Sequence, residues 1–238
     1  MFYFVASSIV RGLMGILTRL EVSGVESVPL EGPLLVVANH LHFVDPPLLG
    51  GAVPRKVIFM AKSEVFSRFP LGLIVRAYEA FSVRRGEGDT GAIRRAIKVL
   101  ASGGALGMFP EGHRSKDGKL LPGRPGAAMI ALRTHATILP VGISGTRTFL
   151  QWPRILNRPP VVVTIGKPFR PDVNPGLSSR EQQAELTDVI MRRIAELLPA
   201  EQRGIYGDRD VAGLPRLSAQ RPIGPRIAKR ELSRKPES

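Results

Sequence analysis

Six short apolar runs, separated by longer segments, are the feature that most constrains the fold of this 238-residue chain. Between residues 33 and 167 the runs are apolar throughout rather than alternately polar and apolar, as in strands buried on both faces. Segments of helical period lie between them, such as Thr90–Leu100 with Asp89 as its expected N-cap. Because parallel strands need such crossovers, the sequence predicts an α/β fold, a mostly parallel central sheet covered by helices. The runs are Leu34–Ala38, Val57–Met60, Ala80–Val83, Leu106–Phe109, Ile138–Ile143 and Val161–Ile165.

The first twenty residues are the most apolar stretch and predict an amphipathic helix, in an N-terminal unit that we assign to residues 1–24. Arg11 would lie near the middle of a spanning helix, at roughly 2.5–3.5 kcal/mol on insertion scales. No positive residue precedes the apolar run, so a signal peptide fits poorly. We therefore favour a helix in a membrane interface, with a core-packed helix and a single span as alternatives. The polar side would comprise Ser7, Ser8, Arg11, Gly12, Gly15, Thr18 and Arg19, and the apolar side Phe2, Val5, Ile9, Leu13, Ile16 and Leu20.

Basic residues outnumber acidic residues by 34 to 20, which gives a net charge of +14. This excess predicts an anionic partner: a membrane surface, a phosphate-bearing small molecule or nucleic acid. Aromatic residues make up 6% of the chain, so a protein that stacks on bases is disfavoured. Because cysteine is absent, disulfides, thiolate metal sites and a cysteine nucleophile are excluded.

The composition changes after residue 202. Residues 203–238 carry nine basic and four acidic side chains, a net charge of +5, and four prolines that interrupt any periodicity. We predict a disordered basic tail there and assign residues 25–202 to the folded domain. A capping box of Ser178 and Glu181 marks the start of the last predicted helix of that domain.

A histidine and an aspartate, five residues apart, follow the first apolar run. His40 comes two residues after Ala38, at the carboxyl edge of the sheet where open α/β folds place their sites. Asp45 precedes Pro46, as an N-cap precedes a proline at the first helical position. The turn could bring the carboxylate to one imidazole nitrogen and leave the other as a general base. A turn histidine and an ordinary capping aspartate are the alternative, and we assign no role to His42.

No serine lies in a nucleophile-elbow context, so a covalent serine mechanism lacks its main component. A histidine–aspartate pair without a nucleophile indicates that the substrate supplies the hydroxyl group. The sequence therefore favours a transferase over a hydrolase.

Three more strand ends deliver polar groups to the same expected edge. Glu111 could accept hydrogen bonds from a polyol, Gly112 permits close approach to the backbone, and Arg114 could bind a phosphate. A surface turn with an ion pair, or a solvated strand edge, is the alternative for each strand end taken alone. The cations at the other two strand ends are Lys62, Arg84 and Arg85.

Four blocks in this order resemble the motifs of the glycerolipid acyltransferases, in particular the 1-acylglycerol-3-phosphate acyltransferases. They are Asn39-His40-x4-Asp45, Phe81-x-x-Arg84, Phe109-Pro110-Glu111-Gly112 and Leu139-Pro140-Val141, and the resemblance covers residues 30–170. It implies an acyltransferase-type α/β fold and transfer of a fatty acyl group from acyl-CoA or an acyl carrier protein to a glycerol hydroxyl. It implies no metal and no cofactor beyond that acyl donor.

The resemblance also implies roles for single residues. His40 would be the general base and Asp45 its orienting partner, and Pro140 would lie on the acyl-donor side. His113 stands where the family usually has threonine, which leaves the acceptor open: lysophosphatidic acid is favoured over glycerol-3-phosphate or another lysolipid. The residues implied to bind the acceptor are Lys62, Arg84, Arg85, Glu111, Gly112 and Arg114.

The sequence also predicts where the protein acts. An interfacial helix and a lysophospholipid acceptor predict a peripheral or monotopic protein at the cytoplasmic face of a membrane. The rival hypothesis is a non-catalytic basic module on anionic membranes or nucleic acid, which would explain the tail but not the histidine–aspartate block. Nucleic acid is the less favoured partner.

Overall fold

The computed structural model describes residues 2–69, 71–83 and 89–207. In this part of the chain, helices and strands alternate much as the apolar runs predict. The helices are α1 (Phe2–Leu17), α2 (Asp45–Ala52), α3 (Leu71–Ala77), α4 (Thr90–Ala101), α5 (Gly126–Thr134) and α6 (Ser179–Ala195). The strands are β1 (Arg19–Ser23), β2 (Leu34–Ala38), β3 (Val57–Lys62), β4 (Phe81–Val83), β5 (Ala105–Met108), β6 (Thr137–Ser144) and β7 (Pro160–Ile165).

The strands form one sheet in the order β1-β7-β6-β2-β5-β3-β4. Adjacent strands are parallel except β6 and β7, which are antiparallel. The prediction of a mostly parallel α/β sheet is confirmed, and each of the six apolar runs corresponds to one strand. One strand was not predicted: β1 lies within the segment assigned to the N-terminal unit, and it pairs with β7. Residues 19–23 are therefore part of the sheet.

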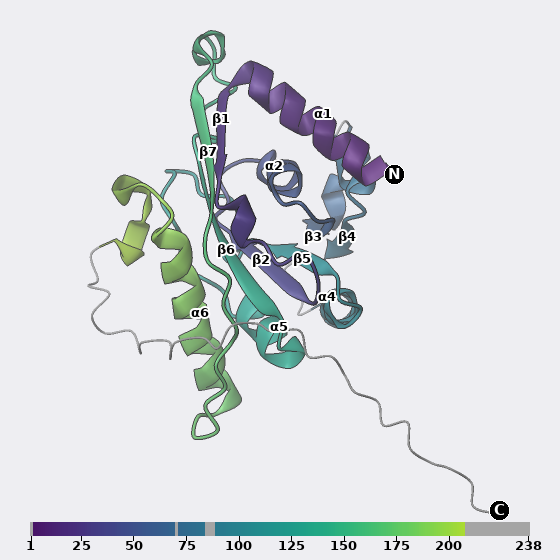
Figure 1. Ribbon diagram of the computed structural model, residues 1–238, viewed down its shortest axis with the longest axis vertical. Coiled ribbons are helices and arrows are strands. Elements are labelled where there is room, and N and C mark those ends of the chain that lie inside the picture. The colour runs from purple at the N-terminus through teal and green to yellow at the C-terminus, as the bar shows by residue number, and fades with distance from the viewer. Residues whose placement is uncertain (1, 70, 84–88, 208–238) are drawn as a thin grey trace, which may run out of the picture.

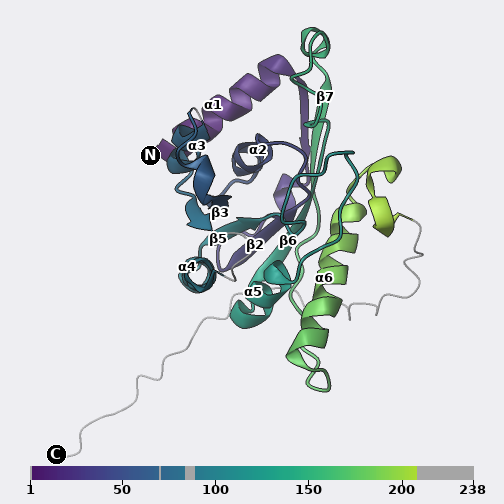
Figure 2. The ribbon, with the colours of Figure 1, turned by 180° about the vertical axis from the view of Figure 1, so that it is seen from behind.

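Strand β2 lies in the middle of the sheet, and its side chains are fully buried on both faces. Leu34, Val36 and Ala38 belong to the apolar cluster that includes α1 and α2. Leu35 and Val37 belong to the cluster formed with α4, α5 and α6. Figures 1 and 2 show the two helical layers on opposite sides of the sheet. The residues after β2 consequently emerge at the centre of the carboxyl edge.

Helix α1 lies across α2, on one face of the sheet (Figure 1), and is anchored by a buried tyrosine. The Tyr3 hydroxyl accepts a hydrogen bond from the Val57 N–H at 2.9 Å and donates one to the Gly50 carbonyl at 3.3 Å. The side of α1 that faces the domain also includes the buried residues Ser7 and Met14. Among the described residues, no helix is long and apolar enough to span a membrane. The apolar residues that α1 instead exposes are Phe2, Phe4, Val5, Ile9, Leu13 and Ile16.

The last helix begins as predicted, because Ser178 and Glu181 form the capping box of α6.

The five residues after the predicted end of the domain are folded, unlike the predicted tail. Gly204–Tyr206 form a 3-10 turn, and the Tyr206 hydroxyl accepts a hydrogen bond from the Gly123 N–H at 3.2 Å. The rest of the predicted tail, 208–238, lies outside the described residues.

Candidate active site

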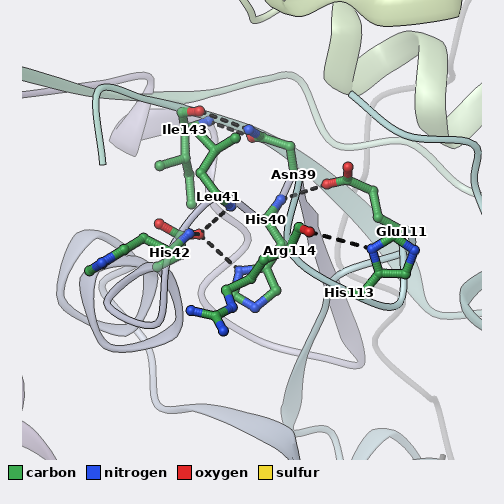
Figure 3. Close-up of polar contacts among 9 residues, drawn as sticks. Asn39, His40, Leu41, His42, Glu111, His113, Arg114 and Ile143 are labelled. Atoms are coloured by element: carbon green, nitrogen blue, oxygen red, sulfur yellow. Dashed lines mark hydrogen bonds and ion pairs between the residues drawn. The ribbon is translucent and has the colours of Figure 1, made fainter. Parts of the chain in front are cut away.

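His40 and Asp45 meet at the carboxyl edge of the sheet, as the sequence predicts. The Nδ1 atom of His40 lies 2.8 Å from Oδ2 of Asp45, and this oxygen also accepts hydrogen bonds from the N–H groups of Leu41 and His42, each at 2.6 Å. Asp45 is fully buried. Figure 3 shows this cluster around the turn between β2 and α2. The turn folds around one carboxylate oxygen, so the histidine and the helix start are held together.

Asp45 does not cap α2 as predicted. It is the first residue of the helix, and Val44 occupies the N-cap position without a side-chain capping hydrogen bond. The carboxylate turns back toward His40 because the N–H groups of the turn and the imidazole are its hydrogen-bond partners. The positive end of the helix dipole favours a negative charge at this position.

The imidazole of His40 is oriented on two sides. Asp45 holds Nδ1, which places the proton there in the neutral ring and leaves Nε2 as the nitrogen that can accept a proton. Phe109, at the end of β5, stacks on the ring with centroids 4.2 Å apart and an angle of 24° between the planes. The side chain retains 11% exposure. This arrangement suits a general base that can reach a bound hydroxyl.

Glu111 lies beneath this site, not on its surface. Its Oε1 accepts a hydrogen bond from the backbone N–H of His40 at 2.6 Å, and its Oε2 accepts one from the N–H of Leu121 at 2.8 Å. Only 1% of the residue is exposed. Burial raises the pKa of Glu111 to about 7, against the lowering effect of the two N–H donors. The carboxylate thus joins three chain segments: the end of β2, the turn after β5 and the segment before α5.

The turn after β5 depends on Gly112. This residue has a φ of +76°, and its N–H donates to the Phe109 carbonyl at 3.0 Å. A Cβ atom there would lie 2.8 Å from Cδ of Arg124, so glycine permits both the turn and the approach of that arginine. Arg114 follows as an exposed cation in the cluster of Figure 3. His113 is exposed too, with Nδ1 3.4 Å from the Arg114 carbonyl oxygen.

The other predicted site residues lie elsewhere along the sheet or outside the described part. Lys62 ends β3, two strands from β2, and its Nζ pairs with Glu64 at 2.8 Å on the exposed surface. Pro140 is buried inside β6, beside Val37 of β2, so it is a strand residue below the carboxyl edge. Arg84 and Arg85, after β4, lie outside the described residues.

Asn39 is a residue of the site to which the sequence assigned no role. Its side-chain amide donates to the Ile143 carbonyl at 2.8 Å and accepts from the Ile143 N–H at 2.7 Å. It therefore replaces a peptide group and continues the pairing of β2 with β6 beyond Ala38. The only sequence signal was its place immediately before His40. His42 is half-buried, burial lowers its pKa, and its Nδ1 has no hydrogen-bond partner within the described part of the chain.

Comparison with known proteins identifies the family. The model of the family described as Acyltransferase matches residues 19–144, more than half of the chain. The chain belongs to the acyltransferase family. The match runs from β1 to the end of β6 and includes His40, Asp45, Glu111 and Arg114. The resemblance inferred from the sequence motifs is confirmed, and the protein is an acyltransferase.

Individual acyltransferases support this assignment over most of the chain. The 1-acyl-sn-glycerol-3-phosphate acyltransferase of Bacillus subtilis (strain 168) is 27% identical over 198 residues, which cover 83% of this chain and 96% of that protein. Its counterpart from Streptococcus pneumoniae (strain ATCC BAA-255 / R6) is 35% identical over 138 residues, 57% of this chain and 49% of that protein. This chain thus spans nearly all of the first relative and about half of the second.

A solved structure shares the fold. The crystal structure of the 1-acyl-sn-glycerophosphate (LPA) acyltransferase PlsC from Thermotoga maritima matches with a TM-score of 0.65 and 29% sequence identity. The match covers 82% of this chain and 79% of that one. The similarity therefore extends beyond the motif blocks to the arrangement of the sheet and its helices.

Proposed function

We propose that this acyltransferase moves a fatty acyl group from a thioester, acyl-CoA or acyl carrier protein, to the free hydroxyl of 1-acylglycerol-3-phosphate. The observation that carries the proposal is the 2.8 Å contact between His40 and Asp45 at the carboxyl edge of the sheet. The relatives named for the same reaction, in Bacillus and Streptococcus, support the choice of acceptor.

In this mechanism Nε2 of His40 takes the proton of the acceptor hydroxyl while the hydroxyl oxygen attacks the thioester carbonyl. The buried Asp45 carboxylate stabilises the imidazolium that forms. The tetrahedral intermediate then expels the thiolate, which receives the proton from the imidazolium and leaves as a thiol. The products are phosphatidic acid and the free thiol of the donor. Positioning of the two substrates contributes several kcal/mol of barrier reduction.

The acceptor carries one phosphate and one free hydroxyl, which fits a base with cations around it. Arg114 is an exposed cation in the cluster around His40, and its guanidinium can bind phosphate in a bidentate manner. Arg84 and Arg85 remain proposed contacts from the end of β4, and Lys62 one from the end of β3. The exposed ring of His113 would lie beside the acceptor rather than beside the base.

The test is release of free thiol from acyl-CoA by the purified protein with lysophosphatidic acid, glycerol-3-phosphate or no acceptor. The cysteine-free chain gives no background with a thiol reagent. We expect release that depends on lysophosphatidic acid and disappears in His40→Ala. His135→Asn is the matched control, because His135 is an exposed histidine that precedes β6 at the opposite edge of the sheet. Equal activity of the His40 variant in a folded protein would refute the mechanism.

We also propose that the exposed apolar residues of α1 bind an anionic membrane at its cytoplasmic face, where the acceptor lipid lies. Ile9, Leu13 and Ile16 are 57%, 51% and 69% exposed, although the opposite side of the helix is anchored by Tyr3. Contact of a row of apolar side chains with water is unfavourable, and burial of the row in lipid removes that contact. The net charge of +14 favours anionic headgroups.

Flotation with vesicles of phosphatidylglycerol and phosphatidylcholine tests this binding. The triple variant Ile9→Ser, Leu13→Ser and Ile16→Ser should lose flotation but retain transfer to a lysophosphatidic acid presented in detergent. The matched control replaces three exposed apolar residues outside α1, Leu30, Val173 and Ile205, by serine. Equal flotation of both variants would mean that α1 is not the membrane anchor. Flotation that depends only on residues 208–238 would favour the basic tail instead.

A further inference from the structure

The main chain around His40 is fixed from both sides of β2, by residues that follow β5 and by a residue of β6. On the β5 side, Glu111 accepts the His40 N–H, and the Ser115 N–H donates to the His40 carbonyl at 2.8 Å. On the β6 side, Asn39 forms its pair of hydrogen bonds with the Ile143 peptide. The peptide groups before and after the base are thus fixed independently of its imidazole.

Glu111 has no oxygen directed to the surface. Each carboxylate oxygen is already bonded to a backbone N–H, from His40 and Leu121, and 1% of the residue is exposed. An acceptor polyol could reach this carboxylate only by displacing those bonds. Hydrogen bonds to a buried carboxylate are stronger than bonds between neutral groups, so that displacement is unfavourable.

We infer that Glu111 is a positioning residue that acts through the backbone of His40, and that it is not a ligand of the acceptor. The inference rests on the proposed function, since it concerns the base of that reaction. It differs from the role that the motif resemblance implies, in which Glu111 shapes the glycerol site. Contact with the acceptor headgroup then belongs to exposed side chains such as Arg114.

The first test separates kcat from KM. Glu111→Gln retains the size of the side chain, but its amide group presents a donor to one of the two N–H groups. We expect kcat to fall about 10- to 100-fold, the usual cost of loosening a group that orients a reactive one, while KM for lysophosphatidic acid stays within about twofold. An acceptor ligand would instead raise KM with little change in kcat, and that result would overturn the inference.

The second test measures binding without turnover. In the His40→Ala background, the Kd for lysophosphatidic acid is measured by calorimetry with and without Glu111→Gln. Because the side chain acts through the base, the added change should leave Kd within about twofold. Arg114→Gln in the same background should raise Kd. A tenfold rise caused by Glu111→Gln would assign the carboxylate to the acceptor and refute the inference.

Controls separate positioning from a loss of stability. Ile190→Val, in the fully buried part of α6, should lower the melting temperature but should not lower kcat as Glu111→Gln does. Asn39→Ala should repeat the kcat loss at unchanged KM, since it releases the other side of the same main chain.

If Glu111→Gln does not fold, Glu111→Asp keeps the charge and can reach only one of the two N–H groups. If the wild type transfers no acyl group to lysophosphatidic acid, the proposed function fails, whereas the Kd comparison still decides the role of Glu111.

Discussion

Oδ2 of Asp45 accepts three hydrogen bonds, one from Nδ1 of His40 at 2.8 Å and two from backbone N–H groups, whereas Oδ1 is buried and has no hydrogen-bond partner among the residues that the structure describes. One carboxylate oxygen therefore orients both the His40 imidazole and the turn that carries it. This division suggests an informative substitution. An asparagine could place its oxygen at Oδ2 and its nitrogen at Oδ1, so the turn would persist without the negative charge.

Asp45→Asn should consequently fold and lose most of its activity. Without the carboxylate the imidazolium is no longer stabilised, and kcat should fall on the order of a thousandfold. Thiol release measures the rate, and the melting temperature checks the fold. Asp188→Asn, which removes an ion pair with Arg192 on α6, serves as the control and should stay within twofold. An active Asp45→Asn enzyme would contradict the assigned role.

Arg114 and Lys62 should differ in their effect on the acceptor. Arg114→Gln is expected to raise KM for lysophosphatidic acid about tenfold with little change in kcat, because a charge-assisted phosphate contact is lost. Lys62→Gln should have a smaller effect, since Glu64 already pairs with the Lys62 ammonium at 2.8 Å on the exposed surface. Steady-state kinetics at low and high salt compares the two. A larger KM change for Lys62→Gln would reverse the assignment.

Glu111 should make stability depend on pH. Burial raises its pKa from 4.5 to about 7 in the folded protein, with the charges of Asp45 and Asp117 adding to the rise. The folded state therefore binds more protons than the unfolded state between these values, and the free energy of unfolding should fall as pH rises from 4.5 to 7. The loss should reach roughly 3 kcal/mol at most and level off above pH 7. Urea unfolding of the wild type and Glu111→Gln should diverge across this window, and parallel curves would argue against the shift.

Tyr3 should tie α1 to the rest of the domain. Tyr3→Phe leaves the N–H of Val57 without its partner in a buried place, which should cost about 1–3 kcal/mol of unfolding free energy. Tyr206→Phe is the matched control, because its hydroxyl bonds to a backbone N–H at a half-buried site. Chemical denaturation measures both variants. An equal effect of the two would mean that Tyr3 is no special anchor.

The strands and the histidine–aspartate pair could be predicted because each has a local signature. A buried parallel strand is a short apolar run, and its end marks the edge of the sheet. Strand β1 was not predicted, because Arg19–Ser23 follows an apolar helix directly and has only five residues, which are alternately exposed and half-buried. Its partner β7 lies about 140 residues further along the chain, which no local pattern indicates.

By itself, the sequence determined the fold class and the pairing of His40 with Asp45 at the carboxyl edge of the sheet. The tertiary structure alone decided which side of α1 meets the domain, through the contact of Tyr3 with Gly50 and Val57. It also decided that Glu111 holds backbone N–H groups rather than facing solvent. The physical reason is the same in both cases. Nearly every residue has a backbone N–H and a carbonyl, whatever its side chain. The residue type therefore does not indicate which backbone group a side chain will bind, and only the folded geometry determines that partner.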